Sequence, residues 1–321
     1  MRPVLGYFIT ILSLAAFIVI LCFVLIPKKD TSGYFLSPLP DFLTVSINKQ
    51  ATLLDLWSPF IDSLSYSGKS LPNYTAKSVL LYDLTTDKTL YGHNTNLHLP
   101  MASLTKIMTA IIAYENKDPY DIYTVTQENL VGEDSMGLGA GEQLRFMDLL
   151  YGLMLPSGND AAEVLASNFP SGRMSFINAM NDKAKALGLT NTRFSNPSGL
   201  QGDGVQYSSA SDLLVITKYA LDTIPEFKQV VSTYEFTIPA TPTHKAYTLF
   251  NETNLLTSYP GVKGVKTGYT PEAGMCLITL LEYKDHKIIG VILNSENRRE
   301  EMKQFLDYSL NQLGITPPSH Q

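Results

Sequence analysis

Three short patches of the sequence carry side chains whose types and spacing fit serine acyl transfer. They are Ser103-Leu-Thr-Lys106, Ser157-Gly-Asn159 and Lys266-Thr-Gly268, and they occur in this order within one domain-sized stretch. Together they supply a hydroxyl nucleophile, two amines and a second hydroxyl that can relay a proton. Each patch alone is weak evidence, because Ser-x-x-Lys also occurs at residues 46–49. Their order, spacing and surroundings predict a serine acyl-transfer site.

Ser103 stands where a helix is expected to begin, so its hydroxyl should lie near the positive end of the helix dipole. Lys106 follows three residues later, which places it on the same helical face. Residues 107–113 are nearly all apolar, so this helix should be buried. Burial and a second cation such as Lys266 would lower the pKa of Lys106 until it can take the serine proton. The alternative is that Ser103 only caps a helix and Lys106 is solvated.

The other two patches are predicted to line the same cleft. Ser157 and Asn159 lie in a turn between two apolar segments, where Ser157 could pass a proton and Asn159 could hold a substrate amide. The alternative is a helix cap, which both residue types favour. Gly268 leaves room for an extended peptide beside its strand, and Lys266 and Thr267 would meet an anion. The alternative is an ordinary strand ending.

The pattern of elements predicts an α+β domain. Strands at both ends of the domain flank a run of helices, which favours an antiparallel sheet shared by the terminal segments. The expected strands are 78–83, 89–92, 264–269, 274–283 and 287–293, and the expected helices are 103–115, 146–155, 160–166, 173–187, 209–221 and 298–313. Ser209 is a plausible N-cap for its helix.

Composition excludes several classes of function. The formal net charge of −6 would repel phosphate backbones, so a nucleic-acid partner is not expected. The two cysteines, Cys22 and Cys276, both lie in apolar runs and are poorly placed to pair. The five histidines show no spacing typical of a metal site, so neither a metal nor another cofactor is expected.

The N-terminal region is predicted to be an uncleaved membrane anchor. Residues 4–26 carry no charge, and a helix needs about 20 apolar residues to cross a bilayer. A cleaved signal peptide and a buried core helix are the alternatives. Positive charges flank the uncharged run on both sides, so they do not determine the orientation of the anchor in the membrane. Residues rich in Ser, Pro and Gly follow as a tether. Trp57 and Phe60 in this tether could touch the bilayer or pack against the main domain.

The three patches, with their neighbours, resemble the motifs of the low-molecular-mass penicillin-binding proteins of the serine D-alanyl-D-alanine carboxypeptidase type, peptidase family S11. The resemblance implies a β-lactamase/transpeptidase-like fold, an antiparallel sheet flanked by helices with a helical subdomain. We expect an anchor at 1–27, a tether at 28–74, the DD-peptidase domain at 75–315 and a tail at 316–321. The uncharged N-terminal run and the resemblance together predict a single-pass protein of the bacterial cytoplasmic membrane with an extracytoplasmic catalytic domain. The segments that carry the resemblance are 100–110, 156–162, 191–200, 209–213 and 264–270.

The resemblance also implies an acyl-enzyme mechanism on peptidoglycan stem peptides, with β-lactams as inhibitors. Ser103 would attack the carbonyl between two terminal D-alanines, Lys106 would act as base and Ser157 would carry the proton. The backbone N–H groups of Ser103 and Tyr269 would form the oxyanion hole. The substrate-binding residues implied are Asn159, Lys266, Thr267, Gly268, Tyr269 and Arg298, of which Lys266, Thr267 and Arg298 would hold the terminal carboxylate.

Two features depart from better-known relatives. Gly158 stands where the related Ser-Asp-Asn form of the middle motif has an aspartate. The stretch after Gly268 is too short for the C-terminal β-rich domain and membrane helix of many carboxypeptidases, so the N-terminal segment is expected to replace that anchor.

Three other functions compete with the carboxypeptidase hypothesis. The same site would serve a DD-endopeptidase that cuts cross-links between stem peptides. A β-lactamase of class A needs a glutamate between the second and third motifs, but residues 164–225 contain none. A non-catalytic wall-binding module would not need the full set of reactive side chains.

Overall fold

The structure is a computed structural model in which residues 57–59, 71–117, 121–253 and 255–320 are described. The predicted anchor at 1–27 and most of the predicted tether at 28–74 lie outside these residues. No helix within the described ranges is both long enough and apolar enough to span a bilayer.

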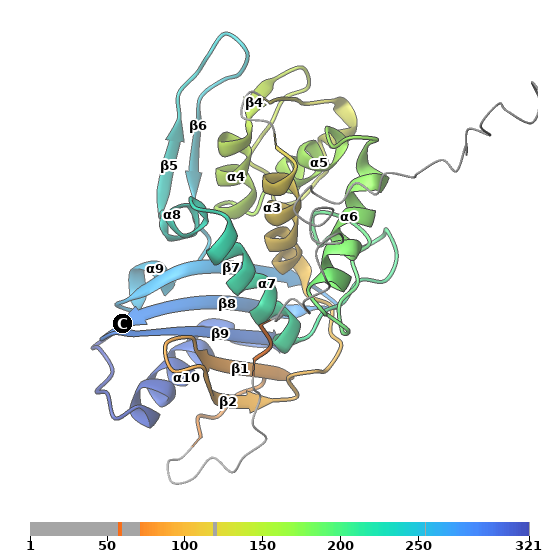
Figure 1. Cartoon of the computed structure of the whole chain (residues 1–321). Helices are drawn as coiled ribbons and strands as arrows, with labels where there is room; N and C mark the ends of the chain where they lie inside the picture. Colours follow the sequence, from red (N-terminus) through yellow and green to blue (C-terminus); the bar gives the residue numbers. More distant parts are fainter. Residues whose placement is uncertain (1–56, 60–70, 118–120, 254, 321) are drawn as a thin grey trace, which may run out of the picture. The chain divides into compact units, whose positions relative to one another are not determined.

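The first and last strands of the described chain share one antiparallel sheet of five strands, in the order β2-β1-β9-β8-β7. Strand β1 pairs with β2 on one side and with β9 on the other, so segments far apart in the sequence lie side by side (Figure 1). The prediction that the two ends of the domain join in one sheet is therefore confirmed. The strands are β1 (Ser78–Asp83), β2 (Lys88–His93), β7 (Val262–Thr270), β8 (Gly274–Tyr283) and β9 (His286–Ser295).

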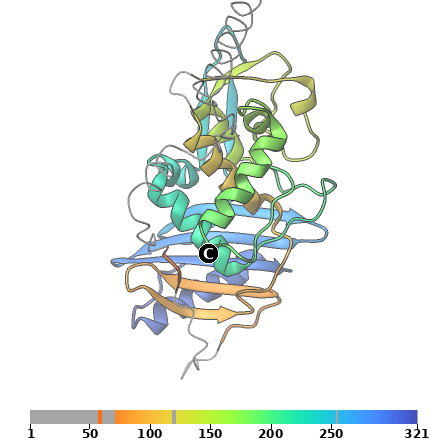
Figure 2. The same ribbon diagram turned by 45° about the vertical axis from the view of Figure 1, so that its right-hand side comes forward.

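Both faces of this sheet are covered, which explains the nearly continuous apolar runs in β8 and β9. Ile288 and Ile292 of β9 pack in a cluster with helix α10 (Arg298–Gln312), whereas Ile289 and Val291 face the larger cluster that includes helix α7 (Ala210–Thr223). Figure 2 shows α10 on one side of the sheet and α7 on the other. Alternate residues of one strand thus stabilise two different cores.

The larger core surrounds one helix that is buried on all sides. Helix α3 contacts the four helices α4, α5, α6 and α7. Its residues from Ile107 to Ala113 are at most 4% exposed. An all-apolar helix is expected at the centre of a core, so its predicted burial is confirmed. The helices of this part are α3 (Lys106–Glu115), α4 (Phe146–Met154), α5 (Asn159–Ser167) and α6 (Arg173–Ala186), with α8 (Phe227–Ser232) nearer the sheet. The short helix α9 (Leu255–Ser258) contributes Leu255 to the cluster around α10.

Two predicted helix starts have different outcomes. The segment expected to be one helix from Ser103 is a 3-10 turn, η1 (Ala102–Thr105), followed by α3 from Lys106. The predicted cap at Ser209 is confirmed, since its hydroxyl accepts a hydrogen bond from the backbone N–H of Asp212 at 3.2 Å. The tight η1 turn redirects the chain just before the buried helix begins.

Two small hairpins and a short turn were not predicted from the sequence. Strand β3 (Ile122–Thr124) pairs with β4 (Gln143–Arg145), and β5 (Glu235–Ile238) pairs with β6 (Tyr247–Phe250); η2 spans Gln127–Asn129. These strands are too short for a clear alternating pattern. The β5–β6 hairpin is fixed by Phe236, whose ring stacks on Tyr151 of α4 with centroids 3.6 Å apart.

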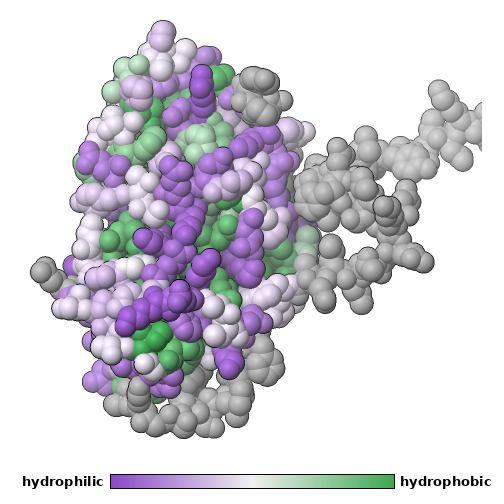
Figure 3. All heavy atoms as spheres, turned by 60° about the vertical axis from the view of Figure 1, so that its left-hand side comes forward, coloured by the Kyte–Doolittle hydropathy of each residue, from purple (hydrophilic) through white to green (hydrophobic). Residues whose placement is uncertain are grey.

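The outer side of the β5–β6 hairpin has a mixed surface. Tyr234 and Phe250 are both more than half exposed, and their rings meet edge to face with centroids 6.3 Å apart. Figure 3 brings this side of the molecule forward and shows hydrophobic groups separated by hydrophilic ones.

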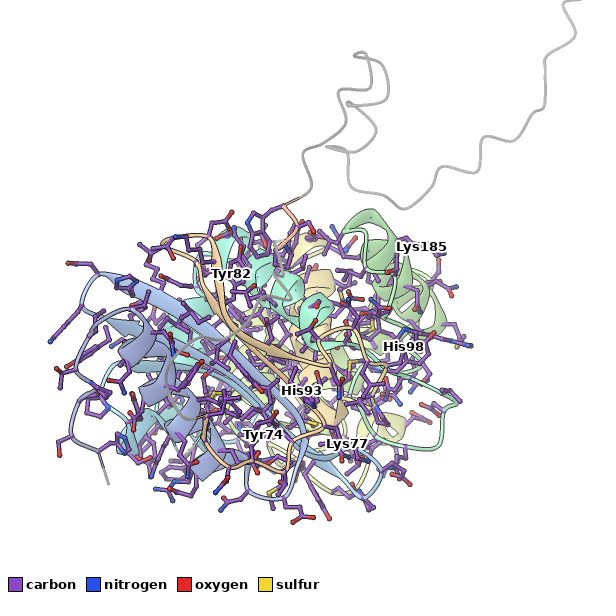
Figure 4. The ribbon with its side chains drawn as sticks, turned by 90° about the horizontal axis from the view of Figure 1, so that it is seen from below. Tyr74, Lys77, Tyr82, His93, His98 and Lys185 are labelled. Carbon is purple, nitrogen blue, oxygen red and sulfur yellow. The ribbon has the colours of Figure 1, made fainter. Side chains whose placement is uncertain are left out.

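Aromatic side chains cover the β1–β2 edge of the sheet. Tyr74 lies beside His93 with ring centroids 5.7 Å apart, and Tyr82 lies farther along β1 (Figure 4). Trp57 meets the Tyr82 ring edge to face at 5.5 Å and donates a hydrogen bond to Asp87 Oδ1. Of the two alternatives for Trp57, packing against the domain is the one observed.

Candidate active site

Ser103 lies within the η1 turn, between the sheet and the buried helix α3. The preceding residue, Ala102, has a φ of +49°, a left-handed conformation that is unfavourable for a residue with a Cβ. Ser103 is buried, with 8% of its surface exposed, and its hydroxyl accepts a hydrogen bond from Lys106 Nζ at 2.8 Å. The η1 N-cap is Met101 and makes no side-chain cap bond, so Ser103 does not act as a cap.

Lys106 is the first residue of α3 and is fully buried. Its Nζ donates to three oxygens: Ser103 Oγ at 2.8 Å, Asn159 Oδ1 at 2.7 Å and the Ser198 carbonyl at 2.8 Å. An ammonium group would donate to all three oxygens, and a neutral amine would donate to two of them and accept from the Ser103 hydroxyl. The alternative in which Lys106 is solvated is therefore wrong.

The surroundings of Lys106 lower its pKa well below the ordinary value for lysine. Burial is the largest cause, and the charge of Lys266 adds to it. The carboxylates of Asp134, Glu252 and Asp160 act in the opposite direction. Burial favours the neutral amine, which is the form that can accept a proton from Ser103.

Ser157 occupies the turn between α4 and α5. Its φ is +62°, again in the left-handed region. Its Oγ is buried and has no hydrogen-bond partner among the residues that the structure describes. A buried hydroxyl without a protein partner is uncommon in native proteins and requires an explanation, such as an ordered water or a catalytic role.

Gly158 and Asn159 complete this turn. Gly158 is the N-cap residue of α5 and no side chain makes a cap bond there, so the helix-cap alternative for Ser157 and Asn159 is wrong. A Cβ at Gly158 would lie 2.8 Å from the Gly152 carbonyl oxygen, too close for any larger residue without movement. The narrow space between α4 and the start of α5 thus explains why the middle motif has a glycine at position 158. Asn159 is buried and faces Lys106.

Asp160 fixes the loop that borders the site. Its buried carboxylate accepts hydrogen bonds from the backbone N–H groups of Met136, Gly137 and Leu138, each at 3.0 Å. The carbonyl of Asp134, in the same loop, accepts a hydrogen bond from the Asn159 N–H at 2.8 Å. These bonds hold the Asp134 charge within electrostatic range of both site lysines.

Lys266 and Thr267 lie on β7, the edge strand of the sheet. Lys266 is 1% exposed, and its Nζ donates to the Thr267 carbonyl at 3.1 Å. Burial lowers the pKa of Lys266 to about 8, with Glu252 and Asp134 opposing the shift. Its charge is close enough to Lys106 to lower the pKa of that residue, so the predicted pairing of the two lysines is present.

Gly268 brings β7 against the serine turn. A Cβ at this position would lie 3.0 Å from the Ser103 backbone nitrogen and 3.1 Å from the Met101 carbonyl oxygen. A larger residue would push the strand away from the turn that carries Ser103. Gly268 therefore sets the distance between the serine and the strand that bears Lys266.

Arg298 begins α10 and reaches the back of β7. Its guanidinium donates to the Gly268 carbonyl at 2.6 Å and to the Cys276 carbonyl at 3.4 Å, and burial lowers its pKa. The neighbouring Arg299 is exposed. The structure thus separates the two arginines and brings only Arg298 to the site, where its observed partners are backbone oxygens.

A cavity of about 590 Å³ adjoins the end of β7. Its wall includes Tyr269, which is 60% exposed, together with Thr270, Gln201 and Glu133. An edge strand beside such a cavity can pair with an extended peptide. No group of three or more potential metal ligands occurs in the described ranges.

Three residues of this site were not predicted as site residues from the sequence. Ser198 contributes a backbone carbonyl, which its residue type does not reveal, although it lies within the segment 191–200 that carries the family resemblance. Glu252 accepts a hydrogen bond from Thr267 Oγ1 at 3.4 Å, and Asp134 faces the lysines. Both lie in loops, with no local pattern that indicates a site.

The sequence matches the family model described as D-alanyl-D-alanine carboxypeptidase over residues 66–297. The chain belongs to the D-alanyl-D-alanine carboxypeptidase family. Among relatives, it is 35% identical to the D-alanyl-D-alanine carboxypeptidase DacF of Bacillus subtilis over 76% of this chain and 64% of that protein. It is 37% identical to the D-alanyl-D-alanine endopeptidase of Pseudomonas aeruginosa over 63% of this chain and 65% of that protein. The chain thus spans slightly less than two thirds of the length of either relative.

Two solved structures have a similar fold. The Streptomyces K15 DD-transpeptidase matches with a TM-score of 0.71 and 32% identity, over 76% of this chain and all of that one. Penicillin-binding protein D2 from Listeria monocytogenes, in its cefotaxime-bound form, matches with a TM-score of 0.67 and 26% identity over 75% of this chain and all of that one. The predicted antiparallel sheet flanked by helices, in a DD-peptidase fold, is confirmed.

Proposed function

We propose that this D-alanyl-D-alanine carboxypeptidase family member hydrolyses the terminal D-Ala-D-Ala bond of peptidoglycan stem peptides through an acyl-enzyme on Ser103. The observation that carries the proposal is the 2.8 Å hydrogen bond between the buried Lys106 Nζ and Ser103 Oγ. A nucleophile in contact with a base of lowered pKa is the arrangement that nucleophilic catalysis requires. Membership of the family supports the choice of substrate.

Acylation begins when neutral Lys106 takes the hydroxyl proton of Ser103, as Oγ attacks the carbonyl carbon before the last residue. The C–N bond then breaks, the leaving D-alanine nitrogen gains a proton and the peptide remains as an ester on Ser103. Ser157 is the proton carrier in this step, since its buried hydroxyl lacks another partner in the described chain. Water hydrolyses the ester with the same groups acting in reverse.

Charge recognition is assigned to the β7 side of the site. Lys266 and Thr267 would hold the terminal carboxylate, with Arg298 adding positive charge from behind the strand. The backbone N–H groups of Ser103 and Tyr269 would bind the developing oxyanion, an interaction worth about 2.7–4 kcal/mol per donor in enzymes of this kind. The close approach of Gly268 to the Ser103 backbone nitrogen supports an oxyanion hole formed jointly by the η1 turn and strand β7. Asn159 would orient a substrate amide as well as Lys106.

Reaction with β-lactams follows from the same chemistry, because a β-lactam presents a strained amide and a carboxylate to this site. The cefotaxime-bound form of a structural relative supports the proposal. The resulting ester would persist as an inhibited enzyme.

The test is incubation of the soluble domain, residues 71–321, and of its Ser103→Ala variant with purified peptidoglycan, followed by mass analysis of the products. Release of D-alanine by the wild type and none by the variant is expected. Release of D-alanine at equal rates by both proteins would contradict the assignment of Ser103.

A DD-endopeptidase activity is the second candidate, supported by the endopeptidase relative and by the cavity beside β7, which would admit a second stem peptide. The same incubation separates the two, since monomers formed from cross-linked dimers indicate the endopeptidase. A β-lactamase is not favoured. Residues 164–225 contain no glutamate, and Glu163, just after the middle motif, is paired with Arg173 through hydrogen bonds of 2.6 and 3.0 Å.

We also propose that residues 1–27 anchor the protein in the bacterial cytoplasmic membrane, that 28–74 form a tether and that the domain at 75–315 is extracytoplasmic. The uncharged run at 4–26 and a substrate in the cell wall support this location. Protease added to spheroplasts should release the domain from the membrane. Complete protection of the domain until the cells are lysed would contradict it.

A further inference from the structure

An acidic side chain stands on the β7 side of the site. Glu252 lies in the loop between β6 and α9 and is exposed, whereas Lys266 beside it is 1% exposed. The Thr267 hydroxyl donates to Glu252 Oε2 at 3.4 Å. A ligand group that approaches Thr267 from solvent thus meets the carboxylate of Glu252 as well as the buried cation.

The position of Glu252 is fixed by its neighbours in the chain. Its backbone N–H donates to the Leu155 carbonyl at 3.2 Å, which ties the loop to the end of α4. The buried Asn251 side chain donates to the carbonyls of Val231 and Thr233 at 3.0 and 3.1 Å, and Asn251 Oδ1 accepts from the Thr253 N–H at 2.8 Å. A loop held on both sides of Glu252 keeps its side chain beside Thr267.

The charges around Glu252 are of both signs. Loss of solvent and Asp134 oppose its ionised form, while Lys266, Lys106 and Arg298 favour it, and together these effects raise the pKa of the carboxyl group. The anion site is therefore built from a buried cation with an accessible carboxylate next to it. A ligand that carries only negative charge is attracted by one group and repelled by the other.

We infer that Glu252 is a specificity-determining residue that favours leaving residues with a positive charge beside the terminal carboxylate and disfavours those with a second negative charge. The inference rests on the proposed function. The terminal carboxylate of the leaving residue would occupy the Lys266 and Thr267 side, and an ammonium group on its side chain would pair with Glu252. D-Lysine, D-alanine and D-glutamate as leaving residues represent the positive, neutral and negative cases.

The test uses three acyl-D-Ala-D-X peptides, with X being D-lysine, D-alanine or D-glutamate, at pH 7, below the pKa of about 8 for Lys266, so that this lysine keeps its charge. Wild-type kcat/KM should be highest for D-lysine and lowest for D-glutamate. In Glu252→Gln the ratio of D-lysine to D-glutamate should fall about tenfold, because the attraction of one leaving residue and the repulsion of the other are both lost and each is weak for a solvent-exposed carboxylate. Glu235→Gln, an exposed glutamate on β5, is the matched control and should leave the ratio unchanged.

The outcomes separate this inference from the proposed function. Failure of the wild type to release any of the three amino acids would overturn the proposed function itself. Release of all three with the same D-lysine to D-glutamate ratio in wild type and Glu252→Gln would overturn the role of Glu252 alone. Labelling of Glu252→Gln by a fluorescent penicillin establishes that the variant is folded and retains its nucleophile.

Discussion

The two buried lysines of the site differ in their surroundings. Lys106 begins a buried helix and donates to three oxygens, one of which belongs to the nucleophile. Lys266 lies on an edge strand and donates to one backbone carbonyl at 3.1 Å. Burial lowers the pKa of both, but that of Lys106 falls well below its ordinary value, whereas that of Lys266 falls to about 8.

This difference in pKa gives the two lysines opposite roles, although their side chains are chemically identical. The positive charge of Lys266 helps to keep Lys106 neutral, so Lys106 can serve as a base. The carboxylates of Glu252 and Asp134 help to keep Lys266 charged, so it can attract an anion. Burial pushes both residues toward the neutral form. At Lys106 the largest charge effect, from Lys266, adds to this shift, whereas at Lys266 the largest charge effect, from Glu252, opposes it.

The largest expected effect comes from Lys106→Arg. Arginine keeps the positive charge but does not lose a proton in proteins, so it cannot accept one from Ser103. The rate of acylation by a fluorescent penicillin should fall by about a thousandfold, within the roughly 10²–10⁴-fold range of general-base catalysis. An acylation rate within about tenfold of the wild type would show that Lys106 is not the base.

Lys266→Arg is the matched substitution on the other lysine. It keeps the charge and changes only its shape and reach, so kcat/KM for D-alanine release should fall by about tenfold. A loss as large as that of Lys106→Arg would mean that the two lysines do not have distinct roles. The two variants should be compared on the same peptide and after thermal unfolding confirms that both are folded.

The pH dependence of kcat/KM gives a third comparison. Activity needs a neutral Lys106 and a charged Lys266, so it should rise as Lys106 loses its proton and fall as Lys266 loses its proton at about pH 8. In Lys266→Arg the charge persists at higher pH, so the alkaline fall should disappear. An unchanged alkaline limb in that variant would assign the limb to another group.

The smallest expected effect concerns the turn that presents Asn159 to Lys106. Gly158→Ala places a Cβ 2.8 Å from the Gly152 carbonyl oxygen. Such overpacking should lower the free energy of unfolding by about 1–3 kcal/mol, measured by chemical denaturation. Gly132→Ala is the control, because a Cβ there has no atom within 4 Å. Equal stability of the two variants would contradict the close contact at Gly158.

Sequence patterns were sufficient where a long segment has one kind of environment. The apolar run after Lys106 predicted a buried helix and hence a perturbed lysine, and the apolar runs of β8 and β9 predicted strands close to those observed. The break between η1 and α3 was not predictable, because it depends on contact of Ala102 and Ser103 with Gly268 of β7. Local sequence carries no information about that distant strand.

The acidic residues of the site also could not be predicted from local sequence. Glu252 is brought to Thr267 by hydrogen bonds of Asn251 to residues about twenty positions earlier in the chain. Ser198 contributes only a carbonyl, a group that every residue has. The side chains with distinctive chemistry were predictable from their motifs, whereas the groups that set the charge of the two lysines depend on tertiary contacts.

The most direct measurement of the central claim is mass spectrometry of the soluble domain after reaction with a penicillin. We expect one adduct per molecule, located by peptide mapping on Ser103, and no adduct in Ser103→Ala. An adduct on any other residue, or equal modification of the variant, would contradict the assignment of Ser103 and Lys106 as nucleophile and base.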